Sequence, residues 1–228
     1  MNTLPLEKLE QTIGHSFSDK SLIGAALTHS STGHDQNYER LEFLGDRVLG
    51  LVVAQSLYKK FPNENEGDLA KRLAALVQGS LLAKIATKIN LGAHIHFSDA
   101  ERGAGGADND HILADVFEAM IGALYLDAGF EACFKLITAL LEDDFYTMKK
   151  PPQHPKTALQ EWAQGAGLSL PVYEIIDQSG PDHAPVFDIS LRIKGYANVV
   201  GQGASRQAAE KAAAEIMIKQ LKDAGIII

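Results

Sequence analysis

Residues Glu39-Arg40-Leu41-Glu42-Phe43-Leu44-Gly45-Asp46-Arg47-Val48-Leu49 lie within a run, 38–61, whose apolar residues recur at helical spacing. At about 100° per residue, Glu39, Glu42 and Asp46 fall on one face of this predicted helix. The opposite face carries an apolar stripe made of Leu41, Leu44, Val48, Leu51 and Val52. Like charges on one helix face repel each other, so the pattern indicates either a metal site or a solvated acidic face.

A second predicted helix, 111–127, carries another acidic pair, Asp115 and Glu118, at i and i+3. Gly122 lies next to these acids and would let a neighbouring backbone or a ligand come close. Two helices that each offer inward acids can build a divalent-metal site in a helical bundle. Oxygen ligands favour Mg²⁺ or Mn²⁺, although a solvated acidic face remains the alternative here too. Phe43 lies beside the acids, off the apolar stripe, so it packs on another helix or enters a partner subunit.

The remaining pattern divides the chain into two regions. Upstream, 38–61, 66–90, 111–127 and 130–148 are predicted helices, and 98–110 is a predicted loop, so region 1–148 is all-α. Residues 149–155 contain three prolines and are predicted to form a linker. Region 156–225 is predicted to be a small α+β domain of order α-β-β-β-α. Its strands are expected at 172–177, 186–193 and 197–200, and its helices at 157–164 and 206–221.

Composition narrows the class of protein. The chain has 228 residues, of which 46% are hydrophobic and 22% charged, as in an ordinary globular protein. The single cysteine, Cys133, excludes an internal disulfide framework. The sequence has no apolar run of the kind that predicts a membrane span or a signal peptide. We therefore expect a cytoplasmic protein with no membrane partner. Residues 1–150 hold 14 basic and 21 acidic groups (net −7), and 151–228 hold 7 and 8 (net −1).

Three blocks of sequence together resemble bacterial ribonuclease III. They are residues 39–49, then Asn65-Glu66-Gly67-Asp68-Leu69, then 112–127. The C-terminal region resembles a double-stranded-RNA-binding domain. The resemblance implies a helical endonuclease domain, acting as a homodimer, that hydrolyses both strands of an RNA duplex. It implies products with 5′-phosphate and 3′-hydroxyl ends and short 3′ overhangs, and roles in ribosomal RNA processing and in messenger RNA processing and decay.

The resemblance also implies roles for particular residues. Glu42, Asp46, Asp115 and Glu118 would hold Mg²⁺, with Mn²⁺ as a substitute, and Asp46 and Glu118 would be catalytic. Glu39 and Glu66 match acids nearby in the family, and we assign them to RNA contact or to support of the site. Phe43 matches a residue that inserts into the partner subunit. Arg47 stands where the family often has a small residue, and we expect it to contact the partner subunit or RNA.

Further matches lie in the region that resembles the RNA-binding domain. Thr157, Gln160 and Glu161 would face one minor groove, and His183, in the loop 181–185, would meet a 2′-hydroxyl in a second minor groove. The start of the last helix would contact phosphate through Ser205, Arg206, Gln207 and Lys211. The family usually has two adjacent lysines where this chain has Arg206-Gln207, so we expect one phosphate contact to be lost.

Two other functions compete with a Mg²⁺-dependent nuclease. One is a scaffold that binds double-stranded RNA without cutting it, and such a protein would be expected to lose one of the four acids. The other is a helical di-metal oxidoreductase, which would require histidine ligands that the acidic helices do not supply. The sequence therefore favours the nuclease.

Overall fold

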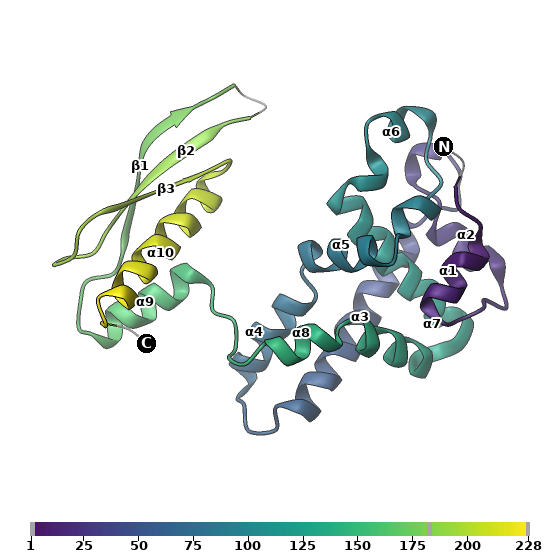
Figure 1. The fold of residues 1–228 in the computed structure, drawn as a ribbon, viewed down its shortest axis with the longest axis horizontal. Helices are drawn as coiled ribbons and strands as arrows, with labels where there is room; N and C mark the ends of the chain where they lie inside the picture. Colours follow the sequence, from purple (N-terminus) through teal and green to yellow (C-terminus); the bar gives the residue numbers. More distant parts are fainter. Residues whose placement is uncertain (1–2, 182–183, 227–228) are drawn as a thin grey trace. The chain divides into compact units, whose positions relative to one another are not determined.

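The computed structural model describes residues 3–181 and 184–226. The chain forms two compact units, Met1–Pro152 and Gln153–Ile228, and each has its own hydrophobic core (Figure 1). Among the described residues, no helix has both the length and the apolar surface needed to cross a bilayer. His183, which the sequence assigns to RNA contact, lies outside the described residues.

The N-terminal unit is built from α-helices and short 3₁₀ turns. The two longest helices, α3 and α7, pack against each other at its centre. The helices are α1 (Leu6–Ile13), α2 (Lys20–Ala26), α3 (Glu39–Lys60), α4 (Glu66–Leu76), α5 (Gly79–Lys88), α6 (Asp99–Gly103), α7 (Asp110–Leu140) and α8 (Glu142–Thr147). The turns are Ser30–Thr32, Leu91–His94 and Gly106–Asp108.

Helix α7 owes its start and its interruption to single residues. The side chain of Asn109 accepts hydrogen bonds from the backbone N–H groups of His111 and Ile112, which caps the helix. Gly129 has φ 79° and ψ −173°, a backbone conformation that glycine adopts far more readily than other residues. The predicted helix end at Ala128-Gly129 is thus an interruption within α7.

The structure corrects the prediction of one continuous helix over 66–90. Helices α4 and α5 are separated by Val77 and Gln78, and Gln78 is extended (φ −69°, ψ 138°). Leu76 and Leu82 are both fully buried. In an unbroken helix they would point about 120° apart, so the break lets both side chains enter the same core. The predicted loop 98–110 also contains α6, which is capped by the Ser98 side chain.

A buried arginine joins α4 to the end of α8. Arg72 is only 1% exposed, and its guanidinium donates two hydrogen bonds to the carboxylate of Glu64, at 2.7 and 2.6 Å. A third hydrogen bond, of 2.6 Å, goes to the backbone carbonyl of Met148, and the guanidinium carbon lies 3.7 Å from the centroid of the Phe61 ring. This buried cation therefore has both charged and polar partners, as burial of a charge requires.

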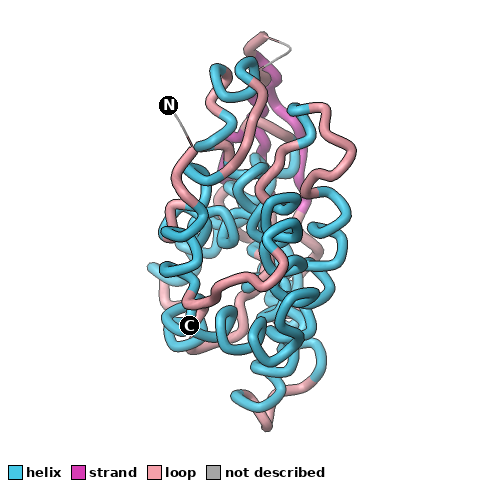
Figure 2. The backbone as a smooth tube through the Cα atoms, turned by 90° about the vertical axis from the view of Figure 1, so that its right-hand side faces the viewer, coloured by secondary structure: helices cyan, strands magenta, loops and turns pink. Residues whose placement is uncertain are grey.

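The C-terminal unit has the predicted α-β-β-β-α order. Its elements are α9 (Pro155–Gly165), β1 (Val172–Ser179), β2 (Val186–Arg192), β3 (Val199–Gly203) and α10 (Arg206–Asp223). The strands form an antiparallel sheet in the order β1-β2-β3, coloured magenta in Figure 2. Leu159 of α9 and Ala213 and Met217 of α10 join Leu191 and Val199 in one core, so both helices cover the same face of the sheet.

Candidate active site

The candidate site lies where α3 crosses α7, and two glycines form this crossing. A Cβ on Gly45 would lie 1.7 Å from the carbonyl oxygen of Glu118, and one on Gly122 would lie 2.2 Å from that of Leu41. The two backbones are therefore in direct contact, which any side chain at these positions would prevent. This confirms the expectation that Gly122 lets a neighbouring backbone approach, and it brings the acids of both helices together.

Three carboxylates at the crossing act on one another. Burial raises the pKa of Glu118 to about 7, and the charges of Glu42 and Asp115 contribute to that rise. Burial also raises the pKa of Glu42, with smaller contributions from Asp115 and Glu39, and burial raises the pKa of Asp115. The protein thus holds three mutually repelling carboxylates where they are partly removed from water. Their repulsion and desolvation cost free energy, and a bound cation would offset that cost.

Asp46 is positioned differently from the other three predicted ligands. Its carboxylate forms an ion pair with the guanidinium of the adjacent Arg47, and the Arg47 charge partly opposes the rise in the pKa of Glu118. Across residues 3–181 and 184–226, no three His, Cys, Asp or Glu side chains are grouped so as to hold a metal ion as they stand. The oxygen donors nevertheless match the chemistry that Mg²⁺ and Mn²⁺ prefer.

The two predicted supporting acids, Glu39 and Glu66, lie in different surroundings. Glu39 is exposed, and its charge raises the pKa of Glu42, so it belongs to the surroundings of the cluster. Glu66 is exposed in the first turn of α4, beyond the far end of α3. Glu66 is not among the charges that shift the pKa of Glu42, Asp115 or Glu118.

Sequence reasoning missed three groups around the acids. Tyr38 precedes α3, and burial together with the charges of Asp115 and Glu42 raises its pKa. The charges of His111 and His29 lower the pKa of Asp115, against the effect of burial. Tyr38 and His111 each stand four residues before an acid, so helical spacing could have found them. His29 comes from a distant segment and stacks on Tyr38 with ring centroids 5.5 Å apart, which no sequence pattern indicates.

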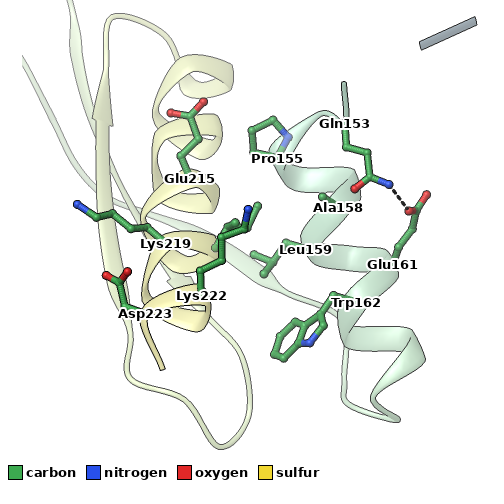
Figure 3. Close-up of a pocket in the computed structure, with 11 residues that line it drawn as sticks. Gln153, Pro155, Ala158, Leu159, Glu161, Trp162, Glu215, Lys219, Lys222 and Asp223 are labelled. Carbon is green, nitrogen blue, oxygen red and sulfur yellow. Dashed lines mark hydrogen bonds between the residues drawn. The ribbon is translucent and has the colours of Figure 1, made fainter. Parts of the chain in front are cut away.

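The predicted RNA-binding residues of α9 lie on one exposed face. Thr157, Gln160 and Glu161 are exposed, whereas Leu159 and Ala163 are buried on the opposite side. The Glu161 carboxylate accepts a hydrogen bond of 3.4 Å from the Gln153 side chain. It also borders a cavity of about 660 Å³ between α9 and α10, into which Leu159 and Trp162 point (Figure 3). This cavity belongs to the C-terminal unit and contains none of the four predicted metal ligands.

The start of α10 is less basic than its sequence suggests. Ser205 caps the helix by accepting a hydrogen bond from the N–H of Ala208, and Gln207 is exposed. The carboxylate of Glu210 binds both Arg206, at 2.9 Å, and Lys156 of α9. Burial raises the pKa of Glu210, but the hydrogen bonds from these two cations outweigh it and lower the pKa overall. Lys211 lies 3.9 Å from Glu215.

Known families match both units of the chain. Residues 19–144 match the family described as Ribonuclease-III-like, and residues 155–221 match the double-stranded RNA binding motif. The chain belongs to the ribonuclease III family. It is 46% identical to Ribonuclease 3 of Caulobacter vibrioides over 217 residues, which cover 93% of this chain and 94% of that protein. It is 46% identical to Ribonuclease 3 of Ehrlichia canis over 222 residues, covering 96% of this chain and 98% of that protein.

A solved structure from the ribonuclease III family agrees with the helical unit. The nuclease domain of ribonuclease III from Campylobacter jejuni superposes with a TM-score of 0.61 at 48% sequence identity, covering 62% of this chain and 99% of that domain. The helical nuclease domain and the C-terminal RNA-binding fold predicted from the sequence are confirmed. The protein is a double-stranded-RNA-specific endoribonuclease.

Proposed function

We propose that the protein hydrolyses both strands of an RNA duplex with Mg²⁺ held at the α3–α7 crossing. The products would carry 5′-phosphate and 3′-hydroxyl ends with short 3′ overhangs. One observation supports this proposal: two helices that meet through glycine backbones bring together three partly buried carboxylates, whose charges raise the pKa values of Glu42 and Glu118. Burying mutually repelling acids costs stability in the absence of a cation, and a site that binds a divalent cation accounts for their placement.

Glu42, Asp46, Asp115 and Glu118 are the residues that would hold the ion. When bound, Mg²⁺ lowers the pKa of an attacking water and stabilises the negative charge on the departing 3′ oxygen. Glu118, whose pKa is raised to about 7, carries a proton in about half of the molecules at pH 7 and would release it as the cation binds. We assign catalytic roles to Asp46 and Glu118, because they flank the crossing on its two helices. Mn²⁺ would substitute for Mg²⁺ at these oxygen ligands.

The acidic surroundings do not conflict with a polyanionic substrate. A divalent cation inverts the local charge of a carboxylate cluster, so the cluster can then receive a phosphate of the RNA backbone. The C-terminal unit would supply the remaining affinity by reading the shape of the duplex. We assign its contacts to the exposed face of α9 and to the start of α10. These contacts are Thr157, Gln160, Glu161, Ser205, Arg206, Gln207 and Lys211, together with His183, which lies outside the described residues.

We also propose that the protein acts as a homodimer. The exposed apolar side chains of the helical unit include Phe43 (69%), Leu51 (58%), Leu126 (53%) and Tyr125 (37%). The sequence had placed Leu51 in the core stripe, and the structure corrects this. Phe43 and Leu126 also border a hollow of about 820 Å³ that a second copy could fill. The Campylobacter jejuni nuclease domain is described as having a region involved in dimer formation.

The substrates follow from the same proposal. Ribosomal RNA precursors and structured messenger RNAs contain duplex segments, and the family resemblance assigns their processing and decay to such a nuclease. We place this activity in the cytoplasm, where these RNAs are made in bacteria and where a lone buried cysteine, Cys133, stays reduced.

Cleavage of a long, perfect RNA duplex tests the proposal. We expect the parent to cut with Mg²⁺ but not with Ca²⁺, and Glu118→Gln to lose at least about a thousandfold in rate, since one ligand of the cation is gone. Both proteins should shift the duplex equally on a gel in Ca²⁺, because binding resides in the C-terminal unit.

Glu131→Gln is the matched control. Glu131 is an exposed carboxylate on the same helix, away from the crossing, so this variant should cut at the parent's rate. A parent that shifts the duplex but never cuts it, with either Mg²⁺ or Mn²⁺, would reject the metal-dependent nuclease and leave an RNA-binding scaffold in its place.

A further inference from the structure

Arg47 is a basic side chain that forms an ion pair with Asp46, one of the four predicted metal ligands. Its charge also opposes the rise in the pKa of Glu118. An arginine keeps its positive charge throughout the pH range in which proteins are stable. It therefore places a permanent cation at carboxylates that the proposed function assigns to Mg²⁺.

The same side chain also lies against the exposed apolar face of the helical unit. The guanidinium carbon of Arg47 is 5.4 Å from the centroid of the Phe43 ring, one helical turn earlier on α3. Arg47 further lines a hollow of about 340 Å³ together with Leu44, Val48, Leu51, Tyr125 and Phe130. A planar guanidinium can stack on an aromatic face while its N–H groups reach a carboxylate, so Phe43 helps to hold Arg47 beside Asp46.

We propose that Arg47 is a positioning residue that competes with the divalent cation for Asp46 and so sets the metal affinity of the site. This inference rests on the proposed metal site and goes beyond it, because it concerns a residue that is not a ligand. With no divalent cation in solution, the guanidinium neutralises Asp46 and part of the charge around Glu118. Binding of Mg²⁺ or Mn²⁺ must displace the guanidinium from Asp46, and this displacement weakens metal binding.

The test measures Mn²⁺ binding to the full-length, chelator-treated protein, from the electron paramagnetic resonance signal of free Mn²⁺. We expect Arg47→Gln to bind Mn²⁺ about fivefold more tightly than the parent, because the cation no longer displaces an ion pair between two unit charges roughly 4 Å apart in water. We also expect the gap between the two proteins to shrink as KCl is raised to about 1 M, because salt screens exposed charges. No cleavage is measured, so RNA binding and chemistry do not affect the readout.

Arg40→Gln is the matched control, because it removes one positive charge from an exposed position on the same helix. Its Mn²⁺ affinity should stay within about twofold of the parent's, since the charge of Arg40 is not among those that shift the pKa of Glu42, Asp115 or Glu118. An equal gain for both variants would reduce the effect to net charge and overturn the inference, as would an unchanged affinity in Arg47→Gln. If instead the parent shows no saturable Mn²⁺ binding that Glu118→Gln removes, the metal site itself fails, and the inference fails with it.

Discussion

At the scale of single residues, Glu118 links the proposed chemistry to the stability of the fold. Its pKa is about 7 in the folded protein, against an ordinary value of 4.5. Between these values the folded chain keeps a proton that the unfolded chain has released. The contribution of this group to stability is therefore complete below pH 4.5 and is lost as the pH rises toward 7. Because Glu118 is only partly buried, solvent screening reduces the effect to the order of 1 kcal/mol.

We predict that the metal-free parent loses a few degrees more in melting temperature between about pH 5 and pH 8 than Glu118→Gln does. The measurement is thermal unfolding, followed by circular dichroism, in the presence of a chelator. Glu131→Gln should behave like the parent. A Glu118→Gln variant with the same pH dependence as the parent would show that Glu118 ionises normally. Saturating Mn²⁺ should narrow the difference in the parent, because metal binding releases the proton.

The sequence predicted which acids share a helix face but not the environment that raises their pKa values. Spacing alone places Glu42 with Asp46, and Asp115 with Glu118. The pKa of Glu118 depends on burial by neighbouring segments and on acids that include one from another helix, which are properties of tertiary structure. For the same reason, the sequence could not predict that His29, from a remote segment, lowers the pKa of Asp115. Helical spacing could have predicted that Tyr38 and His111 lie near the acids.

At the scale of elements, the crossing of α3 and α7 depends on the missing Cβ atoms. We predict that Gly45→Ala destabilises the protein by about 3 kcal/mol or more, because the new Cβ would meet the Glu118 carbonyl oxygen, a backbone atom that cannot rotate away. Separating the helices would also move Glu118 from Glu42 and weaken metal binding. Unfolding in urea measures the first effect, and Mn²⁺ titration measures the second.

Gly50→Ala is the control for this prediction. Gly50 lies on the same helix, and a Cβ added there would meet nothing within 4 Å, so alanine should stabilise the helix by about 0.5–1 kcal/mol. The two substitutions are chemically identical and should have opposite signs. If Gly45→Ala were as stable as the parent, the close backbone contact would not exist in solution.

The elements themselves were largely predictable where their apolar spacing is regular. The long helix over 38–61 and the order of the C-terminal elements came from such patterns. The break between α4 and α5 did not, because its cause is that Leu76 and Leu82 must enter the same core. Local apolar spacing does not show which side chains must enter the same core. Nor could the spacing reveal that Leu51, on the apolar stripe of α3, stays exposed.

At the scale of the whole molecule, the exposed apolar face of the helical unit predicts self-association. We expect Leu51→Asp to sediment as a single chain at concentrations where the parent sediments as two. An unpaired charge buried at the interface would weaken the dimer by at least about a hundredfold. Sedimentation equilibrium of the full-length proteins measures this. Leu51 is exposed in the single chain, so the variant should still fold.

Ile216→Asp serves as the control, because Ile216 is 40% exposed on α10 of the C-terminal unit. It should sediment like the parent. If the parent is a single chain at all concentrations, or if Leu51→Asp remains a dimer, then this face of α3 is not where two copies meet.

The buried Arg72 has a consequence for how the two units share one RNA. Its hydrogen bond to the Met148 carbonyl fixes the point at which the chain leaves the helical unit. Only the short segment 149–154 then precedes α9, and fully extended it spans at most about 20 Å. Once either unit has bound a duplex, the other searches a volume of that radius, which corresponds to a local concentration in the millimolar range. The tether therefore adds to the binding of the near-neutral C-terminal unit, because the second encounter with the duplex becomes intramolecular.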